Sequence, residues 1–366
     1  MERDELWKFS TKTNGYYTFD QMMETAKKRL FYILMMICLN LPVFGQDHIY
    51  SQFFNSPIYL NPALTGQFQG DIRMNLIYRN QWSGLSGDLS YLSASADLNI
   101  PKFGGGVGIL FNRSTEGTAY LTKNNMAATY SYSVGGDELV ASFGIQAGFT
   151  SRKIDWGRLV FSDQIDMRLG YIPGSSSSAQ LPDASGRFYF DAAGGVNIVY
   201  RNFMIGSALH HINKPDESFT GIQAKLPTRL IANASFRIPL NEGSIYNQYA
   251  EGAFLIPSVV YYKQATASSV SAGFQFKYRS VNTGLWYRTS GAGTPDAVVF
   301  SLIFDLFTNR NNGEKLRLGV SHDATTSKIN YTNTNGSTEA SIGYEKYFPN
   351  SSGYYKFNGL RCYDFY

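Results

Sequence analysis

The stretch SVSAGFQFKYR, residues 269–279, alternates strictly between apolar residues and polar or small ones. The two faces read Val270, Ala272, Phe274, Phe276 and Tyr278 against Ser269, Ser271, Gly273, Gln275, Lys277 and Arg279. A period of two predicts a β-strand whose faces lie in different environments. The stretch also has the length of ~9–11 residues with which a tilted strand crosses a bilayer.

The same alternation recurs along the chain, for example in LVASFGIQAGFT (139–150) and KLRLGVSHD (315–323). Segments of this kind are bounded by Gly, Asn, Asp, Ser or Pro, as strands are. The pattern predicts about 14 strands, within a range of ~12–16. Their expected ranges are 71–81, 88–100, 105–114, 123–134, 138–151, 187–200, 202–211, 227–238, 250–263, 268–279, 281–288, 296–307, 314–323 and 338–348.

Aromatic residues gather near the ends of these segments, and the chain has 26 Tyr and 26 Phe. The aromatic residues in question are Tyr78, Trp82, Tyr130, Tyr132, Tyr261, Tyr262, Tyr278, Trp286 and Tyr287. Two aromatic girdles are typical of outer-membrane barrels, in which the sheet must close because an open edge in lipid leaves amides unpaired. The sequence therefore predicts an all-β fold, a transmembrane antiparallel β-barrel over residues 71–348. A soluble β-sandwich is the rival, but its strands are usually shorter.

Residues 22–45 read as a cleaved signal peptide. Lys27, Lys28 and Arg29 precede the apolar run from Leu30 to Leu41, which is too short for a spanning helix, and we expect cleavage after Gly45. Residues 1–21 are then an over-extended start. The outer membrane of a Gram-negative bacterium is the expected location.

The expected mature chain has 26 basic and 23 acidic residues, a balance that does not favour nucleic-acid binding. Its one cysteine, Cys362, has no internal disulfide partner. His210 and His211 are adjacent and would point to opposite faces of a strand, so a shared metal is not expected. Gly104–Gly108 lacks phosphate-loop spacing and indicates close packing at a strand start. No enzymatic activity and no cofactor are predicted.

Three pieces lie outside the predicted strands. Residues 46–70 precede the first strand, residues 152–186 form a long insertion, and residues 349–366 form a short C-terminal tail that we expect in the periplasm. Long connections in compact domains are usually functional or disordered.

The sequence resembles the PorP/SprF family of type IX secretion and gliding proteins of Bacteroidetes from Gln46 to about Phe348. The resemblance rests on QDHIYSQFFNSPIYLNPALTG (46–66), YRNQW (78–82), SDQID (162–166) and HHINKPDESF (210–219). It implies a membrane barrel that works with periplasmic lipoproteins, some of them peptidoglycan-associated. It also implies a role in the secretion or surface attachment of large adhesins.

The predicted function is therefore a non-enzymatic outer-membrane component that anchors lipoproteins, supports adhesin secretion and attachment, or does both. The alternative is an outer-membrane transporter or channel for small or hydrophobic solutes, with residues 46–70 as its plug.

Residues 46–70 are apolar but broken by Pro57 and Pro62, so they cannot pair continuously in a sheet. We expect the segment to fold under or into the periplasmic mouth of the barrel. It would then either dock a periplasmic partner or plug the lumen. The hypothesis assigns partner binding to Gln52, Phe53, Phe54, Pro57, Tyr59, Leu60, Asn61 and Pro62, together with Asp163 and Asp166 of the insertion.

Asp163 and Asp166 lack the glycine and ligand spacing of a calcium loop, so a loop held by bonds from side chains to the backbone is favoured over a metal site. Charged residues on the polar strand faces are expected to point into the lumen, where they form a selective channel or an ion-pair network that fills the barrel. They are Arg73, Arg79, Lys277, Arg279, Lys315 and Arg317.

Overall fold

The computed structural model describes residues 46–118, 120–179, 185–240, 252–309, 314–348 and 361–365. The predicted early start and signal peptide, residues 1–45, lie outside these ranges, as does most of the predicted C-terminal tail. Among the described residues, no helix has the length and apolar character needed to cross a membrane.

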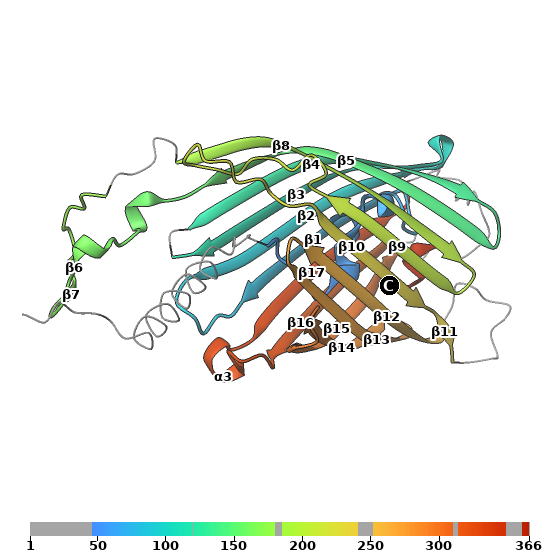
Figure 1. Ribbon diagram of the computed structural model, residues 1–366. Helices are drawn as coiled ribbons and strands as arrows, with labels where there is room; N and C mark the ends of the chain where they lie inside the picture. The colour runs from blue at the N-terminus through green and yellow to red at the C-terminus, as the bar shows by residue number, and fades with distance from the viewer. Residues whose placement is uncertain are drawn as a thin grey trace, which may run out of the picture. The chain divides into compact units, whose positions relative to one another are not determined.

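Long antiparallel strands make up most of the described chain (Figure 1). They are β1 (Ile72–Gln81), β2 (Asp88–Ile100), β3 (Gly105–Gly117), β4 (Leu121–Gly135), β5 (Leu139–Lys153), β8 (Gly186–Tyr200), β9 (Phe203–His210), β10 (Arg229–Phe236), β12 (Ala253–Gln264), β13 (Ala267–Tyr278), β14 (Val281–Ser290), β15 (Pro295–Asn309), β16 (Glu314–Thr325) and β17 (Ser337–Lys346). The short β11 (Ile238–Pro239) continues β10 along β12. Within the described ranges these form a closed barrel of 14 strands, which confirms the predicted fold and strand number.

The first and last strands pair to close the sheet, and the consecutive long strands β10 and β12 continue it without a break. β1 pairs with β17 from Ile72↔Lys346 to Gln81↔Ser337, and β10 pairs with β12 from Arg229↔Gln264 onward. Each strand therefore has a neighbour on both sides. This arrangement satisfies the backbone amides that an open edge would leave exposed to lipid.

The two faces of each strand differ as the alternation predicts. On β5, Phe143, Ile145 and Phe149 point outward and are 52%, 66% and 52% exposed, whereas Ser142, Gln146 and Thr150 are buried inside. The same holds on β13, where Phe274 and Phe276 are exposed and Gln275 is fully buried. An apolar exterior around a polar interior is the arrangement that lipid requires.

Two residues assigned to the aromatic girdles lie inside the barrel instead. Tyr262 and Trp286 are buried, at 5% and 2% exposure, while Tyr287 beside Trp286 is exposed. Neighbouring residues of a strand take opposite faces, so one member of each aromatic pair must point into the lumen. The interior is therefore more aromatic than the sequence prediction supposed.

The two ends of the barrel carry different connections. At one end, here called the turn end, β1 begins and β17 ends, and tight turns join β8 to β9 and β13 to β14. At the other, here called the loop end, lie the long connections 154–185, 211–228 and 326–336. Outer-membrane barrels have short periplasmic turns and longer extracellular loops, so we expect the loop end to face outside the cell.

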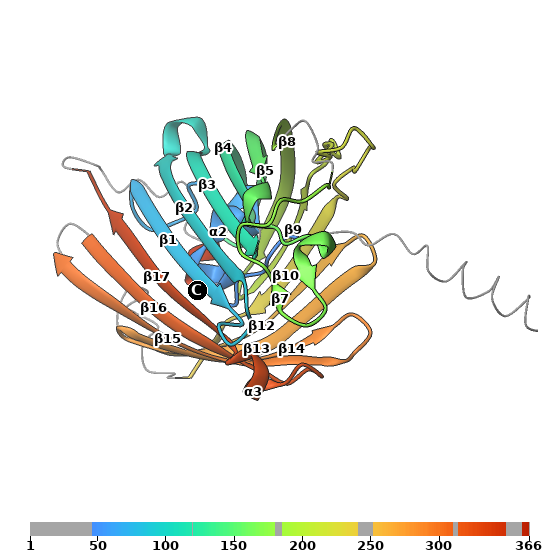
Figure 2. The same ribbon diagram turned by 90° about the vertical axis from the view of Figure 1, so that its left-hand side faces the viewer.

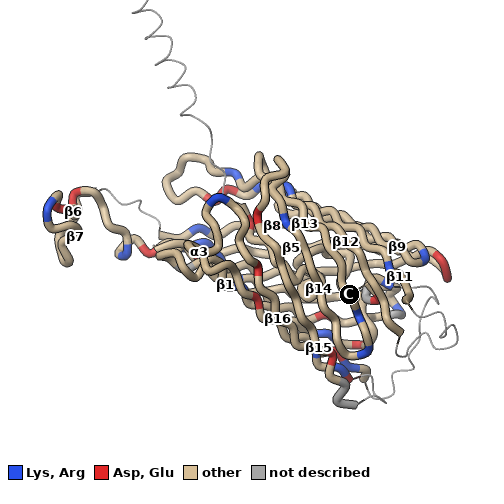
Figure 3. Tube along the Cα trace, turned by 90° about the horizontal axis from the view of Figure 1, so that it is seen from below, with Lys and Arg blue, Asp and Glu red and all other residues tan. Residues whose placement is uncertain are grey.

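Several short elements decorate the barrel. The connection between β5 and β8 holds η4 (Trp156–Arg158), η5 (Ser162–Gln164) and the β6 (Ile165–Asp166) and β7 (Gly170–Tyr171) hairpin, which stands apart from the barrel strands in Figures 1 and 3. α3 (Tyr331–Thr334) lies at the loop end, and η3 (Pro101–Phe103) at the turn end.

A charge on the outer face tests the lipid exposure of the wall. Ile145→Arg is expected to lower the free energy of unfolding from lipid vesicles by about 2–4 kcal/mol, because arginine is costly at mid-bilayer depth. Denaturant titration followed by tryptophan fluorescence measures this change. Ile145→Leu is the control, and equal stability of the two variants would contradict an outward lipid-facing Ile145.

Candidate functional site

The N-terminal segment, residues 46–70, runs inside the barrel from the loop end to the turn end. Asp47 contacts Lys123 near the loop-end start of β4, and Gln67 donates a hydrogen bond to Ser133 near the turn-end limit of β4. In Figure 2, α2 lies among the barrel strands. All residues from Tyr50 to Phe68 are buried. The segment is therefore a plug that occupies the lumen.

Its sequence explains why it folds as three short helices, η1 (Phe53–Asn55), α2 (Pro57–Leu60) and η2 (Pro62–Leu64). Each proline begins a helix, where a missing backbone N–H costs nothing. The Asn61 side chain caps η2 by accepting a hydrogen bond from Ala63 N at 2.9 Å. The two prolines that prevent continuous strand pairing therefore mark where α2 and η2 begin.

The eight residues of this segment to which the sequence hypothesis assigns partner binding all lie within the lumen. Gln52, Phe53, Phe54, Pro57, Tyr59, Leu60, Asn61 and Pro62 are buried. A partner could contact these side chains only if the segment left the barrel. Their contacts in the structure are with the barrel wall, so the geometry fits the plug alternative.

A buried ionic cluster holds the segment inside the lumen, near the loop-end limits of β1, β14, β16 and β17, and we call it the central cluster: Ser51, Gln52, Arg79, Arg288, Asp323 and Glu339. The Glu339 carboxylate accepts the backbone N–H of Ser51 at 2.7 Å and of Gln52 at 2.8 Å. Ser51 Oγ donates to Asp323 at 2.7 Å. Because the wall supplies these acceptors, two backbone groups of the plug are satisfied without water.

The central cluster also balances its charges. Arg79 contacts Asp323 at 3.0 Å and Glu339 at 2.5 Å, and Arg288 contacts Asp323 at 3.0 Å. Breaking a buried ion pair by removing one partner typically costs about 3–5 kcal/mol, because a charge remains buried alone. The two arginines and two carboxylates therefore act as a unit around Ser51.

Glycines in the wall let the plug approach closely. A Cβ on Gly144 would lie 2.2 Å from Ala63 N, and one on Gly106 would lie 2.4 Å from Gly66 Cα. The sequence reading of Gly104–Gly108 as a close-packing site is thus confirmed for Gly106. The opposing Asn61 amide donates to the Val196 and Ser207 carbonyl oxygens at 3.0 and 3.3 Å.

Apolar contacts fill the lumen toward the turn end. Phe53 and Phe54 pack against Trp286, with ring centroids 5.1 and 6.3 Å apart. The same cluster contains Cys362 and Phe365 of η7 (Cys362–Phe365), which are 3% and 0% exposed. The described part of the predicted periplasmic tail thus folds back against the plug, and Cys362 is buried.

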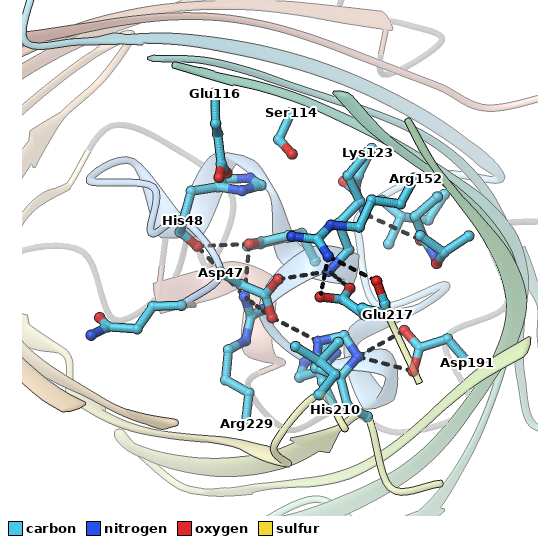
Figure 4. Close-up of a pocket in the computed structure, with 18 of the residues that line it drawn as sticks. Asp47, His48, Ser114, Glu116, Lys123, Arg152, Asp191, His210, Glu217 and Arg229 are labelled. Carbon is cyan, nitrogen blue, oxygen red and sulfur yellow. Dashed lines mark hydrogen bonds and ion pairs between the residues drawn. The ribbon is translucent and has the colours of Figure 1, made fainter. Parts of the chain in front are cut away.

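A second ionic group, here called the outer cluster, holds the segment at the loop end (Figure 4). It consists of Asp47, Lys123, Asp191 and His211. Asp47 lies 3.2 Å from Lys123 Nζ and 2.7 Å from His211 Nε2, and His211 Nδ1 lies 2.9 Å from Asp191. The N-terminal segment, β4, β8 and the connection after β9 therefore meet at one point.

Contacts within the outer cluster shift the pKa values of its ionisable groups. Burial lowers the pKa of His211, but the Asp47 carboxylate and hydrogen bonds to Asp191 and Asp47 outweigh burial and raise it above the ordinary value. Burial raises the pKa of Asp47, but Lys123 and His211 hold it well below the usual range. His48 differs, since burial and then Arg229 lower its pKa to about 3, so that it is neutral at physiological pH.

The two adjacent histidines do not point to opposite faces as predicted. β9 ends at His210, and the positive φ of His211, 57°, breaks the strand alternation. Both side chains are consequently buried, with their ring centroids 6.4 Å apart. Within the described residues no group of His, Cys, Asp or Glu could hold a metal ion.

Most of the charges predicted to face the lumen do so, and they form ion pairs. Arg73 contacts Asp97 at 2.7 Å, Lys315 contacts Glu345 at 2.8 Å, and Arg317 contacts Asp305 at 2.7 Å. Together with the pairs of Arg79 they match an ion-pair network that fills the barrel. Lys277 joins Lys315 and Arg317 in lining a cavity at the turn end of about 630 Å³, including its open part.

Arg279 departs from the prediction. β13 ends at Tyr278, and Arg279 lies in the turn that follows, with φ 52° and an exposed side chain. Its guanidinium carbon is 5.2 Å from the centroid of the Tyr278 ring. The strand ends one residue earlier than expected, so the alternation no longer places Arg279 in the lumen.

Asp163 and Asp166 lie on the exposed connection between β5 and β8. Asp163 accepts the Ser178 N–H at 2.6 Å, and Asp166 accepts those of Arg168 and Leu169 at 2.7 and 2.9 Å. These backbone hydrogen bonds lower the pKa of both carboxyl groups. The prediction of a loop held by bonds from side chains to the backbone is confirmed.

Sequence reasoning missed several residues of the two clusters. Arg288 and Glu339 lie on strands whose alternation already implied an inward direction, so the sequence contained a signal for them. Asp47 and Lys123 carried no local signal. Asp47 contacts His211, 164 positions away along the chain, and Lys123 contacts Asp47, 76 positions away.

Comparisons with known proteins give a family match and several similar solved structures. Residues 43–344 match the family model described as type IX secretion system membrane protein PorP/SprF. A comparison with curated proteins gives no match. Similar solved structures include the Acinetobacter baumannii outer-membrane protein Omp33, with a TM-score of 0.40 and 6% identity over 77% of this chain and 100% of that one. The Pseudomonas putida toluene transporter TodX has a TM-score of 0.39 and 9% identity over 82% of this chain and 94% of that one.

Replacing one glycine of the wall by alanine is expected to weaken the contact between the wall and the plug. Gly144→Ala places a Cβ against the backbone of Pro62 and Ala63, and such overpacking typically costs about 1–3 kcal/mol. Hydrogen–deuterium exchange of residues 60–66 should then accelerate about tenfold or more while the barrel strands stay protected. Gly194→Ala, on the outer face, is the control, because its Cβ would meet nothing closer than 3.6 Å. Equal exchange in the two variants would contradict the close contact.

Retention of the segment at the loop end is expected to depend on pH through His211. Its pKa is raised in the folded state, so its contribution is fully present below the ordinary histidine value of about 6.5 and is lost as the pH rises through the raised value. Protease cleavage near residues 46–50 should therefore increase from neutral toward alkaline pH. The variant His211→Gln should remove this dependence, and an unchanged pH profile in that variant would rule out His211 as its source.

Proposed function

The chain belongs to the PorP/SprF family of type IX secretion system membrane proteins, and we propose that it works in that system as a non-enzymatic outer-membrane scaffold. In this role it anchors periplasmic lipoproteins of the machinery, supports the secretion and surface attachment of adhesins, or does both. The observation that carries the proposal is the occupied lumen. A barrel filled by its own chain offers two end surfaces rather than a path.

The occupied lumen favours a scaffold over the alternative of a transporter. The plug has ionic contacts at the central and outer clusters and apolar contacts with Trp286. Opening a path would expose buried charges such as Glu339 and Asp97, which are 0% and 1% exposed. Such a cost, several kcal/mol for each unpaired charge, disfavours spontaneous opening.

The turn end is the proposed lipoprotein side. It lies toward the periplasm under the rule of short periplasmic turns. The start of β1 and the end of β17 meet there, and η7 closes the lumen from the same side. In this proposal the residues of the N-terminal segment support the surface from within, because they are buried beneath it.

The loop end is the proposed adhesin side, and the β6–β7 hairpin is its most exposed part. Met167 and Leu169 at the hairpin tip are 104% and 80% exposed. The Asp163 and Asp166 hydrogen bonds hold the shape of the connection that presents them. Exposed apolar side chains on a shaped loop are typical of protein interaction sites.

Affinity purification from solubilised outer membranes tests the scaffold proposal. The intact protein should carry secretion-system lipoproteins and adhesins with it, and its deletion should reduce the adhesins at the cell surface. The double variant Met167→Ser/Leu169→Ser should lose adhesins but keep lipoproteins. Lys328→Ser, an exposed change on another connection of the loop end, should keep both.

Channel activity would overturn the proposal. Steady conductance of the intact protein in planar bilayers, together with unchanged secreted and surface proteins in a deletion strain, would support the transporter alternative. A closed barrel and a depleted cell surface would support the scaffold.

A further inference from the structure

An apolar row crosses the outside of β3, β4, β5 and β8, and on the first three of these strands polar and basic side chains follow it toward the loop end. The outward neighbours Phe111, Met126, Phe149 and Phe190 face one another across these strands. They are 38%, 63%, 52% and 46% exposed. Phe149 also stacks on Phe188, with ring centroids 5.3 Å apart. On β3, β4 and β5 this row marks the loop-end margin of the apolar band, and on β8 the band extends one row farther, to Phe188.

On β3, β4 and β5 the next outward row carries hydrogen-bonding and basic side chains, whereas on β8 the same row holds exposed Phe188, which opposes Ser151. Arg113 lies two residues beyond Phe111 on β3 and opposes Asn124, which opposes Ser151. Lys153 follows on β5, two residues beyond Ser151. Arg113 and Lys153 are exposed, and among the described residues neither forms an ion pair with a carboxylate. The lumen-facing cations of the same strands, such as Lys123, are paired.

The change from aromatic to basic residues marks the level of lipid headgroups. Aromatic side chains of outer-membrane barrels lie at the interface, and basic residues beside it attract anionic headgroups. β3 and β5 are separated by one strand, so their backbones lie about 10 Å apart. A headgroup with two phosphates can therefore reach both Arg113 and Lys153.

We propose that this face is a lipid-binding site, in which the phosphates of an outer-leaflet glycolipid contact Arg113 and Lys153 while its acyl chains lie against Phe111, Met126 and Phe149. The charge of the two side chains and the orientation of the barrel in the membrane identify the class of lipid. Exposed cations at this depth attract anionic headgroups, and the loop end faces the outer leaflet, whose glycolipids carry phosphate.

The turn end supplies a contrast. There, exposed Arg201 contacts Glu138 at 2.7 Å, so its charge is compensated within the protein. Lys102 of η3 is exposed at the same end, away from the Phe111 row. Lys102 therefore serves as a matched control for a change of charge that leaves the proposed site intact.

Binding of bisphosphorylated lipid A tests the proposal. The intact barrel in phosphatidylcholine nanodiscs is mixed with lipid A, and bound lipid is counted by native mass spectrometry. The double variant Arg113→Gln/Lys153→Gln should bind about 30-fold more weakly, because each interfacial cation contributes roughly fivefold. Lys102→Gln should bind within twofold of the intact protein. Retained strand content in all proteins confirms that the barrel is folded.

Experiments with different lipid headgroups distinguish the remaining outcomes. Lipid A without phosphates should bind the intact barrel as weakly as lipid A binds the double variant. Equal binding of the two lipid A forms would overturn the phosphate assignment. Equal binding of phosphatidylglycerol and lipid A would overturn the assignment to a glycolipid, and displacement of bound lipid A by millimolar inorganic phosphate would show a site for the free anion instead.

Discussion

Every backbone amide within the hydrocarbon layer must find a partner in the protein, and this requirement shapes the molecule. It forces β1 onto β17, so that a sheet of alternating strands becomes a cylinder. Closure then fixes the two environments of each strand. Apolar residues such as Ile145 face lipid, and polar residues such as Gln146 are left inside.

A polar interior creates the second requirement, since buried charges and amides need partners. The N-terminal segment supplies many of them. Its backbone satisfies Glu339, and its Asp47 carboxylate compensates Lys123 and His211. Contacts of this kind make the lumen part of the folded core, which suits a protein whose partners bind at its ends.

The sequence predicts the wall better than the contents of the lumen. Alternation alone gives the strand number and the faces, because side-chain direction in a strand depends only on position. It fails where a strand ends or bends, as at Arg279 and His211, and where both members of an aromatic pair resemble girdle residues, as at Trp286. The path of the N-terminal segment was beyond such reasoning. It depends on contacts such as Ser51 with Glu339, 288 positions apart, that no local pattern reveals.

Arg79 and Glu339 oppose each other directly across β1 and β17, the first and last strands of the cylinder. Arg79 donates hydrogen bonds to Glu339 and to Ser51 Oγ, and Glu339 accepts one from the Gln52 backbone N–H. The pairing of β1 with β17, which closes the barrel, is therefore also a place where the segment is bound. This geometry couples the closure of the barrel to the position of the segment. Closure of the barrel over an empty interior would bury the Glu339 carboxylate without the two backbone amides that it accepts, whereas closure around the segment supplies both. The pair of residues that joins the first strand to the last thus also stabilises the N-terminal segment inside the barrel.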